Sequence, residues 1–368
     1  MLVRMTNLSL KGFKTIRELV DFKPRPLNIL IGANGAGKTN FISFFRLMSR
    51  MMSERLQEYV AEVGGARSLL HEGPDRTREI EAEISLETEN GMNEYVFRLF
   101  YAAGDILVFA DEKYRFSRQG YPAVAPWSTL GVGHKETKLV SAAATNDTAR
   151  VLLALLRKCI GHQFHNTSAT SRIRGKWSVA DNKRLKEDAA NLAPYLMRLH
   201  DQKPECYRRI VEVLRTVVPF FSEFEFQPEY HKVLLKWREK GSDMVFDVSQ
   251  ASDGMLRTMA LVALLSQPEP DLPAVLVLDE PELGLHPYAI EIVAGMLRSA
   301  SEHSQIVVAT QSAPLVDAFE PEDVIVVDRE GRESRFRRLN GDDLRGWLTE
   351  YTLGELWQKN VLGGRPTR

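Results

Sequence analysis

The stretch that decides the fold runs from Ile31 to Thr39 and reads IGANGAGKT. It contains the pattern G-x-x-x-x-G-K-T and follows the apolar run 27–31 (LNILI), which predicts a buried strand. Apolar side chains then recur at helical spacing: Phe41, Phe44, Phe45, Met48 and Met52. A strand, a glycine-rich loop and a helix in this order predict a loop that binds phosphate.

The chemistry of this loop follows from its residue types. Glycines let backbone N–H groups converge on phosphate oxygens, and a helix N-terminus adds partial positive charge. Lys38 can reach the β- and γ-phosphates, and the Thr39 hydroxyl can ligate Mg²⁺. The residues expected to bind the nucleotide here are Asn34, Gly35, Ala36, Gly37, Lys38, Thr39 and Asn40. The alternative is a chance glycine-rich turn, which would not require the strand before it or the helix after it.

The bulk composition is that of a globular protein. The chain has 368 residues, 44% hydrophobic and 26% charged, which fits one large or two ordinary domains. Its net charge is -1, so any nucleic-acid contact requires a local basic face. The two cysteines lack metal-ligand spacing, which favours ordinary buried thiols over a disulfide. No apolar stretch approaches a membrane span and the start does not resemble a signal peptide, so we expect a soluble, cytoplasmic protein that does not bind a membrane.

The first part of the chain, 1–145, is expected to form a lobe with the phosphate loop and an attached antiparallel sheet. The segment 8–16 reads as a strand that leads into the phosphate loop. Further strands are expected at 80–86, 95–101 and 106–110, with turns at Asn90-Gly91 and Ala103-Gly104.

The pattern becomes mainly helical from Asp147 to about Phe221, which predicts a helical insertion over 146–222. Its basic residues form two clusters: Arg172, Arg174 and Lys176, and Lys183, Arg184 and Lys186. These charges fit either a solvated surface or a contact with nucleic-acid phosphates.

The third part, 223–368, returns to alternating strands and helices. Strands are expected at 223–226, 233–237, 244–246, 275–278, 306–309 and 324–327. Helices beginning at Met255 and Pro287 alternate with the later strands, which predicts a parallel α/β sheet. The phosphate loop and the later motifs would then form one nucleotide-binding core that the insertion splits.

A second motif ends the strand at 275–278. The sequence AVLVLDEP, residues 274–281, places two carboxylates after a buried run. Asp279 can hold Mg²⁺, and Glu280 can accept a proton from an attacking water. A solvated acidic turn is the alternative, and the presence of a phosphate loop favours the catalytic interpretation.

Two further motifs indicate which kind of phosphate-binding protein this chain is. The sequence SQASDGMLR, residues 249–257, precedes a helix for which Ser252 or Asp253 is a natural N-cap. Such a helix start can bind phosphate, although it can also be only a capped helix. In GLHP, residues 284–287, Pro287 suits the first turn of a helix, and His286 is either a cap or an interface residue.

The order of these motifs resembles the ATPase heads of the RecF/SMC/OLD branch of the ABC ATPase superfamily. The ordered motifs are GANGAGKT, SDGMLR, LVLDEPELGLHP and VVATQSAPLV. The ending, with WLTEYTLGELW at 347–357 and GGRP at 363–366, resembles the stand-alone bacterial predicted ATPases that are grouped with OLD-like proteins. The implied fold class is α/β: a split P-loop ABC-type ATPase head with an attached antiparallel sheet and a helical insertion.

The resemblance implies a homodimer that encloses two ATP molecules with Mg²⁺. One subunit supplies the phosphate loop, Asp279 and Glu280. The other supplies Ser252, Asp253 and Gly254 in trans. Gln311 falls where many ABC ATPases carry a histidine that senses the γ-phosphate, and a glutamine can bind phosphate without gaining charge. Gln57 is a weak candidate for the glutamine-bearing loop of the family, with a structural helix position as the alternative.

The resemblance also implies a role beside DNA. The expected activity is ATP hydrolysis that gates a DNA-directed partner, such as a separately encoded nuclease, in phage defence or genome maintenance. We expect no nuclease domain in the roughly forty residues after Val327, because a domain needs more chain. A slow ATPase that acts as a nucleotide-dependent scaffold for an effector is the alternative. A transporter subunit and a small-molecule kinase fit the motifs less well.

Overall fold

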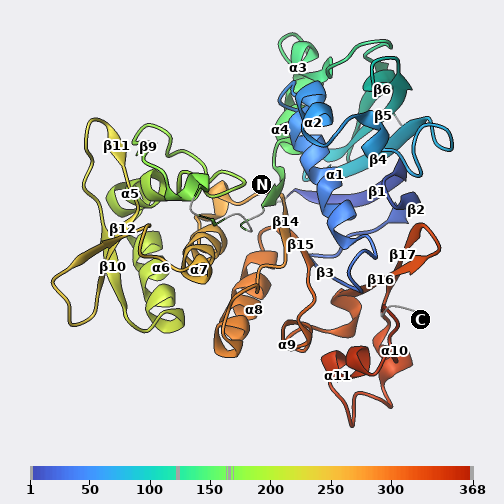
Figure 1. Ribbon diagram of the computed structural model, residues 1–368. Helices are drawn as coiled ribbons and strands as arrows, with labels where there is room; N and C mark the ends of the chain where they lie inside the picture. The colour runs from blue at the N-terminus through green and yellow to red at the C-terminus, as the bar shows by residue number, and fades with distance from the viewer. Residues whose placement is uncertain (1–2, 122–124, 163, 165–166, 169, 365–368) are drawn as a thin grey trace. The chain divides into compact units, whose positions relative to one another are not determined.

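The computed structural model describes residues 3–121, 125–162, 164, 167–168 and 170–364 (Figure 1). Arg365 and Pro366 of the GGRP sequence lie outside the described residues. The chain divides into two compact units with boundaries that differ from the three expected segments. The first unit comprises 1–161, 273–277 and 304–368, and the second comprises 162–272 and 278–303.

The first unit contains a six-stranded antiparallel sheet, as the alternating segments predicted. Its strands, in spatial order, are β2 (Ile16–Phe22), β1 (Arg4–Phe13), β4 (Glu79–Thr88), β5 (Gly91–Ala102), β6 (Ile106–Arg118) and β7 (Ser128–Thr129). The hairpin between β4 and β5 turns at Glu89 and Asn90, where the Asn-Gly sequence predicted a turn.

The expectation of one strand over 8–16 is wrong, because the chain reverses within that segment. β1 ends at Phe13 and pairs antiparallel with β2, with Phe13 opposite Ile16. Lys14 takes a positive φ of 50° at this turn. The apolar alternation continues across the turn on both strands, so the pattern alone did not reveal it.

A second six-stranded sheet carries the phosphate loop. Its strands, in spatial order, are β17 (Glu333–Arg338), β16 (Val324–Glu330), β3 (Leu27–Ile31), β15 (Gln305–Ala309), β14 (Val275–Asp279) and β8 (Cys159–His162). β3 runs parallel to both β15 and β16, as predicted for an α/β core. β17, which the sequence did not predict, pairs antiparallel with β16.

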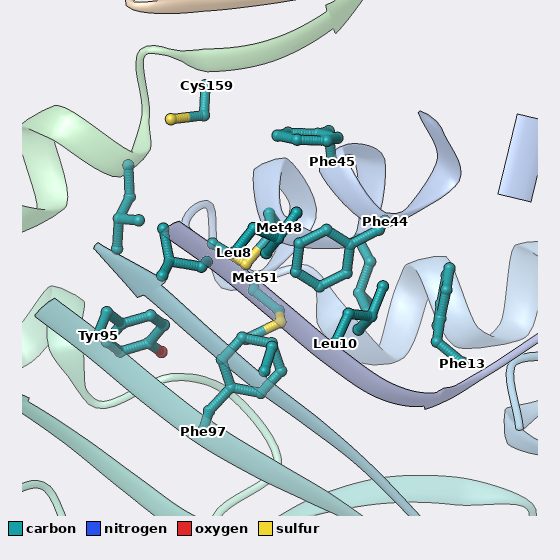
Figure 2. Close-up of a cluster of buried hydrophobic side chains, with 14 of the residues drawn as sticks. Leu8, Leu10, Phe13, Phe44, Phe45, Met48, Met51, Tyr95, Phe97 and Cys159 are labelled. Atoms are coloured by element: carbon teal, nitrogen blue, oxygen red, sulfur yellow. The ribbon is translucent and has the colours of Figure 1, made fainter. Parts of the chain in front are cut away.

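The helix α1 (Lys38–Met51) supplies much of the core of the first unit. Its buried side chains belong to the same hydrophobic cluster as those of β1, β4 and β5 and those of β3 and β15. Figure 2 labels part of this cluster: Leu8, Leu10, Phe13, Phe44, Phe45, Met48, Met51, Tyr95, Phe97 and Cys159. Phe44 and Phe45 pack edge to face, with ring centroids 5.7 Å apart. This packing fixes the start of α1, and therefore the phosphate loop before it.

Short helices complete the first unit. They are α2 (Leu56–Glu62), α3 (Leu139–Ala142), α4 (Asp147–Leu156), α9 (Ala313–Val316), α10 (Gly341–Leu344) and α11 (Leu353–Gln358), with single 3₁₀ turns η1 (Ala66–Ser68) and η4 (Pro321–Asp323). Thr352 and Glu355 form a capping box at the start of α11.

The second unit packs four helices with small sheets. The helices are α5 (Leu192–Gln202), α6 (Pro204–Val217), α7 (Asp253–Leu265) and α8 (Pro287–Ser301). One sheet has the order β10 (Phe221–Glu225), β12 (Lys236–Glu239) and β13 (Val245–Asp247), and β9 (Trp177–Ser178) pairs with β11 (Lys232–Val233). The expected strand 233–237 is therefore split between β11 and β12. α7 is buried along most of its length, which makes it the central helix of this unit.

The segment 157–191 departs from the expected helical pattern. Its described residues form β8, β9, the 3₁₀ turn η2 (Arg172–Arg174) and irregular chain. The fully buried Asn191 holds part of this chain, because its amide donates to the carbonyl oxygens of Asp181 and Arg184. Side-chain hydrogen bonds to the backbone take the place of helical ones here.

Candidate nucleotide-binding site

The phosphate loop connects β3 to α1, as the sequence predicted. All five residues of β3 are buried, and the loop ends at Gly37, the N-cap of α1. Gly37 has a φ of 117°, and a Cβ atom there would lie 2.0 Å from Ser334 Oγ. Only glycine fits this position, so the backbone can turn tightly into the helix.

The Lys38 ammonium lies inside the curve of the loop. Its Nζ atom donates to the carbonyl oxygens of Gly32 at 2.6 Å and Ala33 at 3.1 Å. Thr39 is exposed beside it. A buried lysine held at a helix N-terminus fits a polyanionic ligand, and an exposed hydroxyl next to it fits a metal-bound phosphate.

A chain of hydrogen bonds braces the loop from behind. Asn40 Nδ2 donates to Thr15 Oγ1 at 2.7 Å, Thr15 Oγ1 lies 2.6 Å from Ser334 Oγ, and Ser334 Oγ donates to Ala36 O at 2.5 Å. Sequence reasoning missed Thr15 and Ser334, because Thr15 lies in the turn between β1 and β2 and Ser334 lies in β17, more than 300 residues away. The Asn40 side chain serves this brace, in addition to its expected place beside the nucleotide.

The loop opens on a cavity of about 560 Å³. Its wall is formed by Gly32, Ala33, Asn34, Gln311, Ser312, Ala313, Pro314, Trp357, Gln358 and Gly364. The structure thus brings Gln311 beside the start of the phosphate loop, as its position in the motif order implies. Ser312 caps α9 by accepting from Leu315 N, which fixes the chain just after Gln311.

The C-terminal segment also reaches this cavity. Gly364 N donates to Asp328 Oδ1 at 2.6 Å, and a Cβ atom on Gly364 would lie 3.3 Å from the Cα atom of Gly32. The end of the described chain therefore packs against the first glycine of the phosphate loop. The resemblance of the ending to stand-alone ATPases pointed to this segment, but only the fold shows its place.

The acidic pair lies at the end of β14 and belongs, with the residues around it, to the second unit. Asp279 and Glu280 are half-buried, and Glu280 has a φ of 42°. A non-glycine residue in this left-handed region stores backbone strain of about 1–3 kcal/mol, which is a frequent property of functional positions.

A small cavity of about 10 Å³ adjoins this pair, roughly the space of one water molecule. Its lining comprises His162, Phe164, Arg257, Leu278, Asp279, Glu280 and Pro281. His162 is buried, and this burial lowers the pKa of its imidazole to about 4, so the ring is neutral. Nothing in the sequence singled out His162, because a lone histidine at a strand end carries no motif.

The SDG motif forms the start of α7. Ser252 is the N-cap and accepts from Met255 N at 3.2 Å. Gly254 faces the loop after β14, and a Cβ atom on it would lie 2.9 Å from Gly284 O. Ser252 and Asp253 remain exposed, so the helix start is available to a ligand or a partner.

His286 is the N-cap of α8, and its Nδ1 accepts from Tyr288 N at 3.3 Å. This geometry supports the capping alternative for His286, with Pro287 in the first turn as expected. Leu283 and Tyr288 on either side are exposed.

The basic residues of the predicted insertion form ion pairs. Arg172 pairs with Asp188, Lys176 with Glu229 and Lys186 with Asp181. The basic clusters are thus partly neutralised, which favours a solvated surface over a phosphate contact.

Two minor expectations concern Gln57 and the cysteines. Gln57 Nε2 donates to the carbonyl oxygens of Leu107 and Lys135, which supports a structural role for it. Cys159 and Cys206 are both free thiols. Among the described residues, none of the helices has the length and apolar character that a membrane span needs.

Comparison with solved structures identifies the fold. The head domain of an SMC protein bound to the C-terminal winged-helix domain of ScpA matches with a TM-score of 0.63 and 14% identity, covering 93% of this chain and 99% of that chain. An SMC head domain with an extended coiled coil from Pyrococcus furiosus gives 0.59 at 14% identity, covering 95% and 99%. One from Pyrococcus yayanosii gives 0.56 at 13%, with the same coverage. A search of curated proteins gives no match.

The chain therefore has the fold of the SMC head domains. A family model described as "AAA domain, putative AbiEii toxin, Type IV TA system" matches residues 27–318. The chain belongs to this family of AAA domains.

Proposed function

We propose that this protein binds ATP with Mg²⁺ and hydrolyses it. The observation that carries the proposal is the loop between β3 and α1, where the Lys38 ammonium lies among backbone carbonyl oxygens at a glycine-lined helix start. A triphosphate would replace these carbonyl oxygens as the partner of Lys38, and the loop N–H groups would bind its oxygens.

The remaining roles follow from the chemistry of each side chain. Thr39 and Asp279 are the residues that would hold Mg²⁺, since a hydroxyl and one carboxylate beside substrate phosphates suit this ion. Bound Mg²⁺ would neutralise charge that develops on the phosphate oxygens. Among the described residues, no cluster of three or more His, Cys, Asp or Glu side chains offers a competing metal site.

Glu280 is the proposed general base. Its carboxylate would accept a proton from a water molecule as that water attacks the γ-phosphorus. Gln311 would donate a hydrogen bond to the γ-phosphate from its amide, and it cannot add positive charge there. This difference favours slow turnover.

We further propose that two chains form a dimer around two ATP molecules. Ser252, Asp253 and Gly254 would then contact the γ-phosphate held by the other subunit. The exposed start of α7 and the exposed side chains of Leu283 and Tyr288 support an interface at this surface. Loss of the γ-phosphate would weaken such an interface and convert hydrolysis into movement.

The biological role proposed for this ATPase is to gate a DNA-directed partner, such as a separately encoded nuclease, in phage defence or genome maintenance. The resemblance to OLD-like ATPases supports it. A local basic face could contact DNA, and Lys183 and Arg184 are exposed basic residues of the insertion. The second candidate is a scaffold that holds an effector and turns over ATP slowly, which Gln311 favours.

The test is the solution mass of the Glu280→Gln protein, measured by light scattering with and without Mg-ATP. We expect a shift from monomer to dimer that Ser252→Arg abolishes, because the larger side chain fills the contact. Ser53→Arg is the matched control, since it adds the same side chain at an exposed serine outside the SDG motif. A mass that does not respond to nucleotide would contradict ATP-driven dimerisation and favour the scaffold.

A further inference from the structure

Arg174 lies in the segment 146–222, and its side chain is mostly buried. It ends the 3₁₀ turn η2, and only 14% of its side chain is exposed. Its neighbour Arg172, on the same turn, is 60% exposed and pairs with Asp188 at the surface. The two arginines of one turn therefore have different environments.

The Arg174 guanidinium binds the segment that leads into α7. Its Nη1 donates to Val248 O, and its Nη2 donates to Ala251 O at 3.1 Å and to Asp253 Oδ1 at 3.0 Å. Its Nε donates to Thr167 O at 2.8 Å, which anchors the arginine to its own segment. Four of the five N–H groups of a guanidinium can be satisfied by these contacts.

We propose that Arg174 is a positioning residue for the signature loop, defined as residues 248–254. It holds the loop in one conformation, so that Ser252 and Gly254 are already in place when the triphosphate on a second copy of this chain arrives. This inference rests on the proposed function, because it assumes that the loop acts in trans.

Hydrogen bonds within the chain also hold the two ends of the signature loop. Asp247 Oδ1 accepts from Ser249 N and Ser249 Oγ, and Gln250 N donates to Asp247 O, which closes a turn at the start of the loop. After it, Ser252 caps α7. Arg174 holds the carbonyl group of Val248 within the turn and that of Ala251 between the turn and the cap.

Charge gives Arg174 a second effect. Asp253 is exposed and lies at the helix start that would face a polyanion. The Arg174 guanidinium balances this carboxylate, and its loss would leave one negative charge facing the triphosphate. Lysine cannot replace it, because one ammonium lacks the planar fork that reaches two carbonyl oxygens and a carboxylate together.

The experiment compares Arg174→Ala, Arg174→Lys and the matched control Arg172→Ala in the Glu280→Gln protein. We expect both Arg174 variants to raise the dimer dissociation constant in Mg-ATP by about 10-fold or more, equivalent to about 1.4 kcal/mol. The affinity of the monomer for a fluorescent ATP analogue should change by no more than about twofold, as for Arg172→Ala. A change in the dimer dissociation constant without a change in ATP affinity distinguishes loop positioning from general damage to the fold.

Unchanged dimerisation in both folded Arg174 variants would overturn the inference. Should Arg174→Ala not fold, Arg174→Lys decides, because lysine retains the charge and most of the packing. A Glu280→Gln protein that stays monomeric in Mg-ATP would instead contradict the proposed function. In that case amide hydrogen exchange over 247–255 tests whether Arg174 holds the signature loop. We expect faster exchange in Arg174→Ala but not in Arg172→Ala. Equal exchange rates in the two variants would refute the inference.

Discussion

The brace behind the phosphate loop allows a quantitative prediction for Ser334→Ala. Ser334 is 2% exposed and makes two side-chain hydrogen bonds, to Ala36 O at 2.5 Å and with Thr15 Oγ1 at 2.6 Å. Each such bond contributes about 0.5–1.5 kcal/mol net, so the two together contribute about 2 kcal/mol. The substitution also leaves a loop carbonyl oxygen without this partner, while alanine keeps the Cβ atom and creates no clash.

The assay is amide hydrogen exchange of the segment 27–51, read by mass spectrometry, because it reports local opening of β3, the loop and α1. A loss of about 2 kcal/mol raises the population of the open form by about 30-fold. Ser53→Ala is the matched control, since Ser53 Oγ also donates to a backbone carbonyl oxygen but lies at the surface. Its effect should stay within about 0.5 kcal/mol. Equal exchange rates in the two variants would refute the reasoning that the brace stabilises the loop.

Three further outcomes are expected. Lys38→Ala should lower the affinity for an ATP analogue by roughly 100-fold, because a charge-assisted hydrogen bond contributes about 1.5–3 kcal/mol. Unchanged affinity would contradict the proposal that this loop binds ATP. Gly254→Ala should destabilise the second unit by about 1–3 kcal/mol in a urea titration, since its Cβ would meet Gly284 O, whereas Gly295→Ala in α8 meets nothing within 4 Å and should not destabilise it. In the native protein at pH 8, Cys159 should resist alkylation, because burial raises the pKa of its thiol to about 12 and thiolate forms only as the pH approaches that value; rapid labelling would contradict this burial.

The elements around the motifs were predicted well from sequence because their signals are local. β3, β14 and β15 are short buried runs that read as strands without any knowledge of their neighbours. The starts of α7 and α8 were predicted because Ser252 and Pro287 are residues that helix starts select.

The errors arose where pairing or distant side chains decide the structure. The turn at Lys14 interrupts an apolar alternation that both strands of the hairpin share. The segment 157–191 avoids a helix because side chains such as Asn191 and Arg174 bond to its backbone. β17 was not predicted because it lies at the edge of the sheet and consists mainly of polar and charged residues, such as Arg335 and Arg337, so it lacks an apolar strand pattern.

The sequence by itself determined that a strand, a glycine-rich loop and a helix follow one another, because the apolar run and the helical spacing are local signals. The glycine, lysine and threonine at that spacing are the residue types on which the proposed phosphate site depends. It also determined that an acidic strand end and a capped helix follow far along the chain. Only the tertiary structure decided what supports these motifs: Ser334 and Thr15 behind the phosphate loop, Gly364 against Gly32, and Arg174 on the signature loop. These contacts join residues that are far apart in the chain, and no local pattern encodes which distant side chain will satisfy a given backbone carbonyl group.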